Sequence, residues 1–115
     1  MIRCSKKSPV YPIATAFVFS LLERIAKGEY RAASRMIDDG EDYLFGRLEL
    51  ALSDGGEFPS VEEIDYFVIH FFPRGLHRGY DYSVEFYIPC SNMTMHTKIE
   101  LERVRGGFRV HLINC

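Results

Sequence analysis

The sequence predicts an α+β fold, with N-terminal helices packed on a four-stranded antiparallel meander. In the first half of the chain, apolar residues recur every three or four positions, which is typical of amphipathic helices. In the second half, apolar and polar residues alternate between turn-forming residues, which is typical of strands with one buried face. The chain has 115 residues, 47% of them apolar, enough for one domain with its own core. We therefore expect a single domain over residues 1–115, with a flexible segment at residues 1–9.

Two helices are expected at the start of this domain. The first covers Ile13–Ala26, because Pro12 suits a first helical turn and Gly28 suits a helix end. The second covers Glu29 to about Asp38, and Gly40 should stop it.

The segment Tyr43–Leu52 fits two structures. Leu48, Leu50 and Leu52 alternate as in a strand, whereas the wider apolar spacing fits a helix. We favour the helix, because most of its residues are good helix formers and Asp42 can cap its start.

The first strand of the meander follows a short turn. Ser60–Glu63 has the spacing of a capping box, while Phe67–Phe72 is rich in β-branched and aromatic residues and ends at Pro73. Because this strand is apolar on both faces, we expect helices or another chain to cover both.

The next two strands can be placed in register from the sequence. A four-residue loop, Cys90–Met93, pairs Ile88 with Met95 and Glu85 with Lys98. A shift by one residue would bury Lys98, and burial of an unpaired charge is costly.

The last hairpin contains Gly106–Gly107, and glycine suits both positions of a two-residue turn. A turn at these two residues pairs Leu101 with Leu112 and Glu102 with His111. The outer face of the sheet then carries a mixed polar and aromatic set: Tyr87, His96, Lys98, Glu100, Glu102, Arg109 and His111.

Composition restricts the classes of partner. A formal charge of −2 argues against a nucleic-acid-binding protein, which is normally basic. Three cysteines are an odd number and suggest a reducing compartment. The apolar N-terminal stretch is interrupted by Pro12, is too short to span a membrane and lacks a signal-peptidase motif. We expect a cytoplasmic protein that binds neither nucleic acid nor a membrane.

The loop between the first two predicted strands is a candidate anion-binding site. Arg74, His77 and Arg78 lie there with two glycines, whose backbone N–H groups can approach an anion closely. A solvated hairpin loop with ordinary surface charges is the alternative interpretation.

Asp38, Asp39, Glu41 and Asp42 form an acidic cluster. Their spacing does not fit a calcium loop, because the alternating ligands and the distant bidentate glutamate are missing. Helix capping explains part of the cluster, and the charge could also attract a basic partner.

The four histidines are too scattered for a zinc motif, so we expect no metal and no cofactor. No serine or cysteine lies in a known nucleophile motif, so no catalytic residue is assigned. His70 is interpreted as a hydrogen-bonded core histidine, with a general base as the alternative.

One stretch carries a family resemblance. The long helix, the joint Gly28–Glu29–Tyr30 and the second helix before a meander resemble the nuclear transport factor 2-like fold. The resemblance implies helices packed across a bent sheet in a cone-like shape with an open mouth. It also implies functions that range from small-molecule enzymes to immunity proteins that block bacterial toxins. No site motif of the enzymatic members matches, so none is transferred.

Our leading hypothesis is a non-enzymatic protein-binding module, most concretely an immunity-type protein that neutralises a cognate toxin. The candidate partner-binding residues are Asp38, Asp39, Glu41, Asp42, Tyr87, His96, Lys98, Glu100, Glu102 and His111. The alternative is a small enzyme or small-molecule-binding protein with a pocket between helices and sheet, formed by Tyr66, His70 and Tyr82. A homodimer through the outer sheet face is a third alternative.

Overall fold

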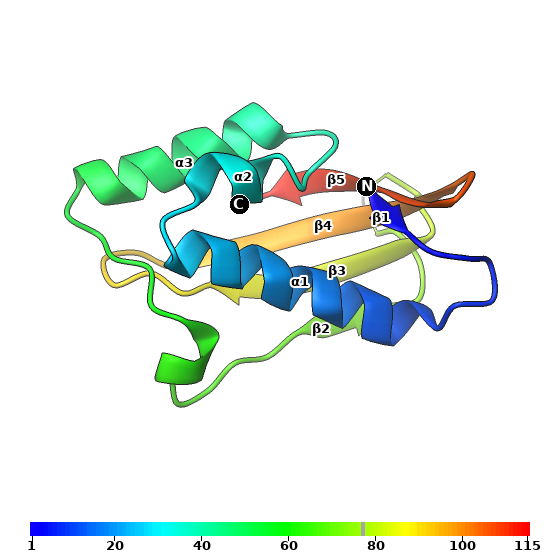
Figure 1. Ribbon diagram of the computed structural model, residues 1–115, viewed down its shortest axis with the longest axis horizontal. Helices are drawn as coiled ribbons and strands as arrows, with labels where there is room; N and C mark the ends of the chain where they lie inside the picture. The colour runs from blue at the N-terminus through cyan, green and yellow to red at the C-terminus, as the bar shows by residue number, and fades with distance from the viewer. Residues whose placement is uncertain (77) are drawn as a thin grey trace.

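The computed structural model describes residues 1–76 and 78–115 and confirms the α+β class. Over these residues, three α-helices lie on one face of a five-stranded antiparallel sheet of order β1-β5-β4-β3-β2 (Figure 1). The helices are α1 (Val10–Ala26), α2 (Tyr30–Ser34) and α3 (Glu41–Ser53), followed by the 3₁₀ helix η1 (Val61–Glu63). The strands are β1 (Ile2–Arg3), β2 (His70–Phe72), β3 (Tyr82–Ile88), β4 (Met95–Val104) and β5 (Gly107–Asn114). None of the described helices combines the length and apolar character of a membrane span.

The fifth strand comes from the N-terminal segment, so the expected count of four strands was wrong. β1 pairs with the start of β5, with Ile2 opposite Phe108 and Arg3 opposite Gly107. A Cβ atom on Gly107 would collide with the backbone oxygen of Ile2. Glycine at this position therefore lets the two backbones meet, and the segment expected to be flexible contributes an edge strand.

The register between β3 and β4 is confirmed, including Ile88 opposite Met95 and Glu85 opposite Lys98. The register between β4 and β5 was wrong by two residues. The turn residues are Arg105–Gly106, so Gly107 enters the ladder opposite Val104. A shift of two preserves the faces, and the predicted inner and outer sides of both strands remain correct.

The second helix ends earlier than expected. α2 stops at Ser34 rather than near Asp38, because the chain then bonds to the sheet. The backbone N–H groups of Asp38 and Asp39 both donate to Val110, and Leu112 donates to the carbonyl of Asp39. The prediction that Tyr43–Leu52 forms a helix rather than a strand is confirmed, because this segment lies within α3.

The strand expected over Phe67–Phe72 is reduced to β2, and its predicted cover on both faces was wrong. His70 is exposed, and β2 is the edge of the sheet. The preceding segment turns toward α1, where the ring of Phe67 lies 5.6 Å from that of Phe19. Packing against α1 therefore competes with further pairing along β3.

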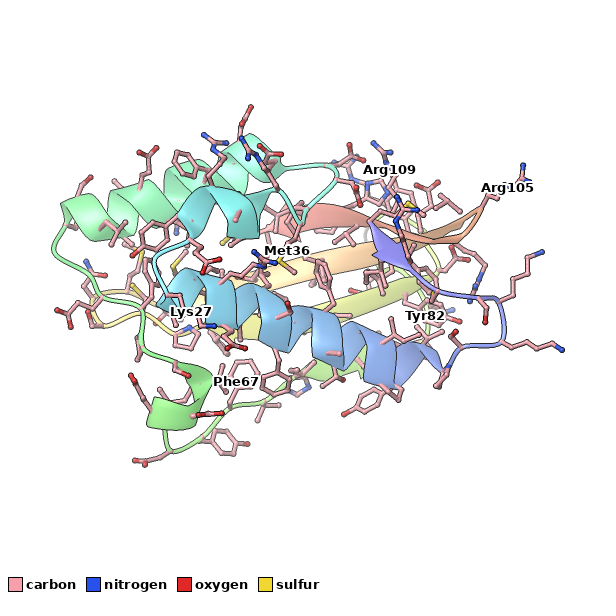
Figure 2. All side chains as sticks on the ribbon, viewed as in Figure 1. Lys27, Met36, Phe67, Tyr82, Arg105 and Arg109 are labelled. Carbon is pink, nitrogen blue, oxygen red and sulfur yellow. The ribbon has the colours of Figure 1, made fainter. Side chains whose placement is uncertain are left out.

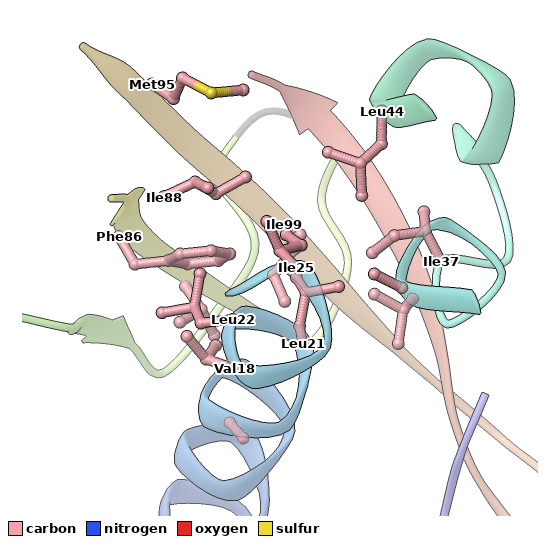
Figure 3. Close-up of a cluster of buried hydrophobic side chains, with 14 of the residues drawn as sticks. Val18, Leu21, Leu22, Ile25, Ile37, Leu44, Phe86, Ile88, Met95 and Ile99 are labelled. Carbon is pink, nitrogen blue, oxygen red and sulfur yellow. The ribbon is translucent and has the colours of Figure 1, made fainter. Parts of the chain in front are cut away.

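The core fills the space between the helices and the inner face of the sheet. Figure 3 shows α1 residues packed against β3 and β4, with α3 closing one side. Its largest fully buried side chains are Leu21, Leu22, Ile25, Ile37, Leu44, Leu48, Phe86, Ile88, Met95, Ile99, Leu101 and Phe108. Burial of each such side chain contributes about 1.5–3 kcal/mol, so this layer is the main source of stability.

Candidate functional site

The outer face of the sheet is partly covered by the connection between β2 and β3. Glu100 on β4 is fully buried there. Its carboxylate accepts hydrogen bonds from the backbone N–H groups of Leu76 (2.7 Å) and Arg78 (3.3 Å). A Cβ atom on Gly75 would lie 2.6 Å from that carboxylate, so this glycine permits the close approach.

The predicted anion-binding loop therefore binds an anion that belongs to the protein itself. The side chains of Arg74 and Arg78 themselves are exposed. His77, the third residue of that hypothesis, lies outside the described residues.

His111 on β5 is enclosed by acidic and aromatic neighbours. Its Nδ1 lies 2.6 Å from Asp39, its Nε2 lies 2.8 Å from Glu102, and the Tyr80 ring stacks on it at 4.1 Å. Each ring nitrogen of His111 therefore has a carboxylate within hydrogen-bond distance. The predicted contact with Glu102 exists, but it is diagonal, since Glu100 is the direct neighbour of His111.

The acidic cluster is occupied by cations and N–H groups of the same chain. Asp38 accepts from the N-terminal amino group (3.0 Å) and from the backbone N–H of Val110 (2.7 Å). Arg109 binds Asp39 at 3.1 Å, and this hydrogen bond is the main reason that the pKa of Asp39 is lowered. These carboxylates join the α2–α3 connection to β5.

Glu41 and Asp42 lie at the start of α3 and share one cation. The guanidinium of Arg31 lies 3.2 Å from Glu41 and 3.3 Å from Asp42. Two of the four residues of the predicted acidic cluster therefore form ion pairs that link α2 and α3.

A second ion pair lies further along the outer face. The Lys98 ammonium is 2.7 Å from Glu85. The partner-surface hypothesis expected Lys98 to be exposed, but it is buried. The hydrogen bond from Lys98 lowers the pKa of Glu85, and the positive fields of His96 and His70 add to this effect.

The part of this face beyond Glu85 is open. Tyr66 is 81% exposed and Tyr87 is 52% exposed, and His70 and His96 are exposed beside them. The rings of Tyr87 and His96 lie 5.1 Å apart. We call Tyr66, His70, Tyr87 and His96 the outer-face patch.

The outer-face patch borders a hollow of about 330 Å³. It is lined by Ile64, Tyr66, Phe67, Val68, His70, Tyr87 and Pro89. Two separate sequence hypotheses meet here, because Tyr66 and His70 were assigned to a pocket and Tyr87 and His96 to a partner surface. Sequence periodicity could not join them, since the bend of the chain before β2 decides where Tyr66 lies.

Tyr82, the third residue of the predicted pocket, is on the other face of the sheet. Its ring lies 5.5 Å from Phe71 and 5.7 Å from Phe108. The pocket hypothesis is therefore corrected: the structure brings Tyr66 and His70 to one hollow but places Tyr82 in the inner layer.

A groove between α1 and η1 was missed by the sequence analysis. It has a volume of about 510 Å³. Its lining is Phe19, Glu23, Ala26, Lys27, Phe58, Ser60, Val61, Glu62 and Glu63. The available signal was the stretch between Arg47 and Arg74, which contains six acidic residues and no lysine or arginine.

Neither a metal-binding cluster nor a comparison with known proteins assigns a role to these residues. Among residues 1–76 and 78–115, no group of three or more His, Cys, Asp or Glu side chains is placed to hold a metal ion. No family model, curated protein or solved structure matches this chain. The site is therefore interpreted from its own residues.

Proposed function

We propose that this protein is a non-enzymatic, cytoplasmic binding module, most concretely an immunity-type protein that neutralises a cognate bacterial toxin. The observation that carries the proposal is the outer-face patch. It presents two tyrosines and two histidines, all exposed, at the end of a face whose other charged groups already have internal partners. Tyrosine is enriched at protein interfaces because its ring supplies a large contact area and its hydroxyl a hydrogen bond.

The surroundings of the buried ionisable groups support binding over catalysis. Lys98 pairs with Glu85, Glu100 accepts two backbone N–H groups, and His111 lies between two carboxylates. A general base needs a ring nitrogen free to accept a proton, and both nitrogens of His111 are engaged. The space between the helices and the inner face is filled with apolar side chains.

Membership of the nuclear transport factor 2-like superfamily, with its cone-like shape, is part of the same proposal. The helix–joint–helix order around Gly28 and the placement of the helices on one face of an antiparallel sheet support it.

A small-molecule-binding protein is the second candidate. The hollow beside the outer-face patch favours it, because about 330 Å³ lined by aromatic and aliphatic side chains with one histidine suits a small apolar ligand.

The test of the leading proposal is binding to the toxin encoded by a reading frame next to this chain's own. The purified wild-type protein should bind that toxin at micromolar concentration or tighter and suppress its activity. Tyr66→Ala and Tyr87→Ala should each weaken the binding at least tenfold, because truncation of an interface anchor costs about 2 kcal/mol or more.

Tyr43→Ala is the matched control, since Tyr43 is 56% exposed on α3, away from the outer face. It should bind like the wild type in titration calorimetry. The proposal would be rejected if the wild-type protein does not bind the toxin at micromolar concentration, or if Tyr43→Ala and Tyr87→Ala lose affinity equally.

A further inference from the structure

The groove between α1 and η1 joins segments that are far apart in the sequence. One wall comes from the C-terminal half of α1, and the other comes from the segment between α3 and β2. Figure 1 shows this segment leaving α3 and passing beneath the end of α1. Such a groove forms only in the folded protein, and its shape depends on how firmly η1 is held.

The apolar floor of the groove is held in place by ring contacts. Phe58 is buried and its ring lies 5.8 Å from that of Tyr30. Phe19 is 41% exposed, and its other side is supported by Phe67. A large aromatic side chain half open to solvent inside a concave site offers an apolar surface to a partner.

A capping box fixes the opposite wall. The Ser60 hydroxyl accepts from the backbone N–H of Glu62, and the Glu63 carboxylate accepts from the backbone N–H of Ser60, both at 3.3 Å. This reciprocal pair holds η1, and Val61 and Glu62 line the groove from this fixed turn.

The rim of the groove is acidic. Glu23, Glu62 and Glu63 line it together with Lys27, whose ammonium lies 3.0 Å from Glu23 and is thereby neutralised. The other two rim carboxylates, Glu62 and Glu63, belong to an acidic stretch of the sequence that also contains Glu49, Asp54, Glu57 and Asp65. The groove lining therefore carries three carboxylates against one cation, although the net charge of the whole chain is only −2.

The other end of the molecule is basic. Exposed Arg3, Lys6, Lys7 and Arg105 belong to the N-terminal segment and the β4–β5 turn. Figure 2 shows Arg105 at the end of the long axis opposite Lys27 and Phe67. Such a charge separation orients an approaching partner, so that positive charge meets the groove end first.

We propose that this groove binds a basic amphipathic segment of a partner protein. An apolar side chain of the segment packs on Phe19, Phe58 and Val61, while its lysine or arginine residues bind the carboxylates of Glu62 and Glu63. The inference rests on the proposed binding function and adds to it a second contact surface and the chemistry of the partner. Polyanions are disfavoured at this surface by the same carboxylates.

Two synthetic peptides of about 14 residues test the proposal, one amphipathic with leucine and lysine and the other with leucine and glutamate. Fluorescence anisotropy with the full-length protein should give a micromolar Kd for the lysine peptide that weakens with salt. The glutamate peptide should bind at least tenfold more weakly. Equal binding of the two peptides, or no binding of the lysine peptide, overturns the proposal.

Variants locate the binding on the protein. Glu62→Lys and Val61→Asp should each weaken the lysine peptide at least tenfold, whereas Glu49→Lys, the same charge change on α3, should change Kd less than twofold. Glu63 is left intact, because it caps η1. Circular dichroism checks that each variant is folded. If Glu49→Lys and Glu62→Lys lose affinity for the lysine peptide equally, net charge alone attracts the peptide, and the proposal that the groove binds it is rejected.

The toxin titration separates this inference from the proposed function. If Tyr66 and Tyr87 are needed for toxin binding but the peptides do not bind, the groove proposal fails and the proposed function stands. If the peptides bind as expected but the wild-type protein binds no toxin, the proposed function fails and the groove proposal stands.

Discussion

The backbone N–H of Leu76 donates a hydrogen bond to the Glu100 carboxylate at 2.7 Å, although 24 positions separate them in the sequence. Together with the N–H of Arg78, it solvates a carboxylate that has no access to water. A buried anion without donors is strongly destabilising, so this contact holds the connection between β2 and β3 over the sheet.

Glu100→Gln should destabilise the protein by about 1.5–3 kcal/mol, the range for a hydrogen bond to a charged group. The neutral amide accepts hydrogen bonds more weakly and adds an N–H₂ group beside the two N–H donors. Urea unfolding measures the free energy, and limited proteolysis should cut residues 73–81 faster. Glu49→Gln, on the exposed side of α3, should change stability by less than about 0.5 kcal/mol. Similar effects for the two variants would contradict the structural role of Glu100.

Gly107→Ala should detach β1 from β5, since the new Cβ overlaps the backbone of Ile2. The expected cost is about 1–3 kcal/mol, with faster amide exchange at Cys4, whose N–H donates to the carbonyl of Gly106. Gly46→Ala is a matched control on α3, where a Cβ meets nothing within 4 Å. That variant should stabilise the protein by about 0.5–1 kcal/mol, because alanine favours the helix. Destabilisation by both substitutions would argue against a specific clash at β1.

Acid should weaken the protein through the Glu85–Lys98 pair. The pKa of Glu85 is lowered in the folded state, chiefly by its hydrogen bond to Lys98, so the unfolded chain takes up a proton first as pH falls. The contribution of the pair is complete above the ordinary glutamate pKa of about 4.3 and is lost as pH falls through the lower folded value. Denaturant unfolding between about pH 6 and pH 3 should therefore show a shallower acid decline in Glu85→Gln than in the wild type. The exposed Glu62→Gln should keep the wild-type slope, and a wild-type slope in Glu85→Gln would refute this assignment.

His111→Ala should destabilise the protein by about 1–3 kcal/mol, because it leaves Asp39 and Glu102 without their shared partner and removes the stacking on Tyr80. His96→Ala removes the same side chain from an exposed position on the same face. It should change the free energy of unfolding by less than about 0.5 kcal/mol. Thermal unfolding compares the two, and equal shifts in Tm would exclude a special role for His111.

Local pattern explains which predictions succeeded. The loop length at Cys90–Met93 and the alternation on both sides of it determine the β3–β4 register, because a shift by one residue would place Lys98 and the core residues on the wrong faces. α3 was also predictable, since Leu44, Leu48 and Ala51 form one buried stripe at helical spacing.

The errors arose where two local structures were equally acceptable. Arg105–Gly106 and Gly106–Gly107 both suit a two-residue turn, and the choice depends on the approach of β1 to Gly107, from the far end of the chain. The expected helix over residues 29–38 has a helical composition, yet its last residues bond to Val110 of β5.

The candidate sites show the same division. The sequence by itself determined the α+β class and the side of the sheet on which each strand residue lies, because side-chain periodicity is a local property of the backbone. Tertiary structure alone decided that Glu100 and His111 are buried and bonded to other groups of the chain, whereas Tyr87 and His96 are exposed. It also decided that Phe19 and Val61 line the same groove. Burial and proximity depend on which distant segment packs over a residue, and no local pattern encodes that.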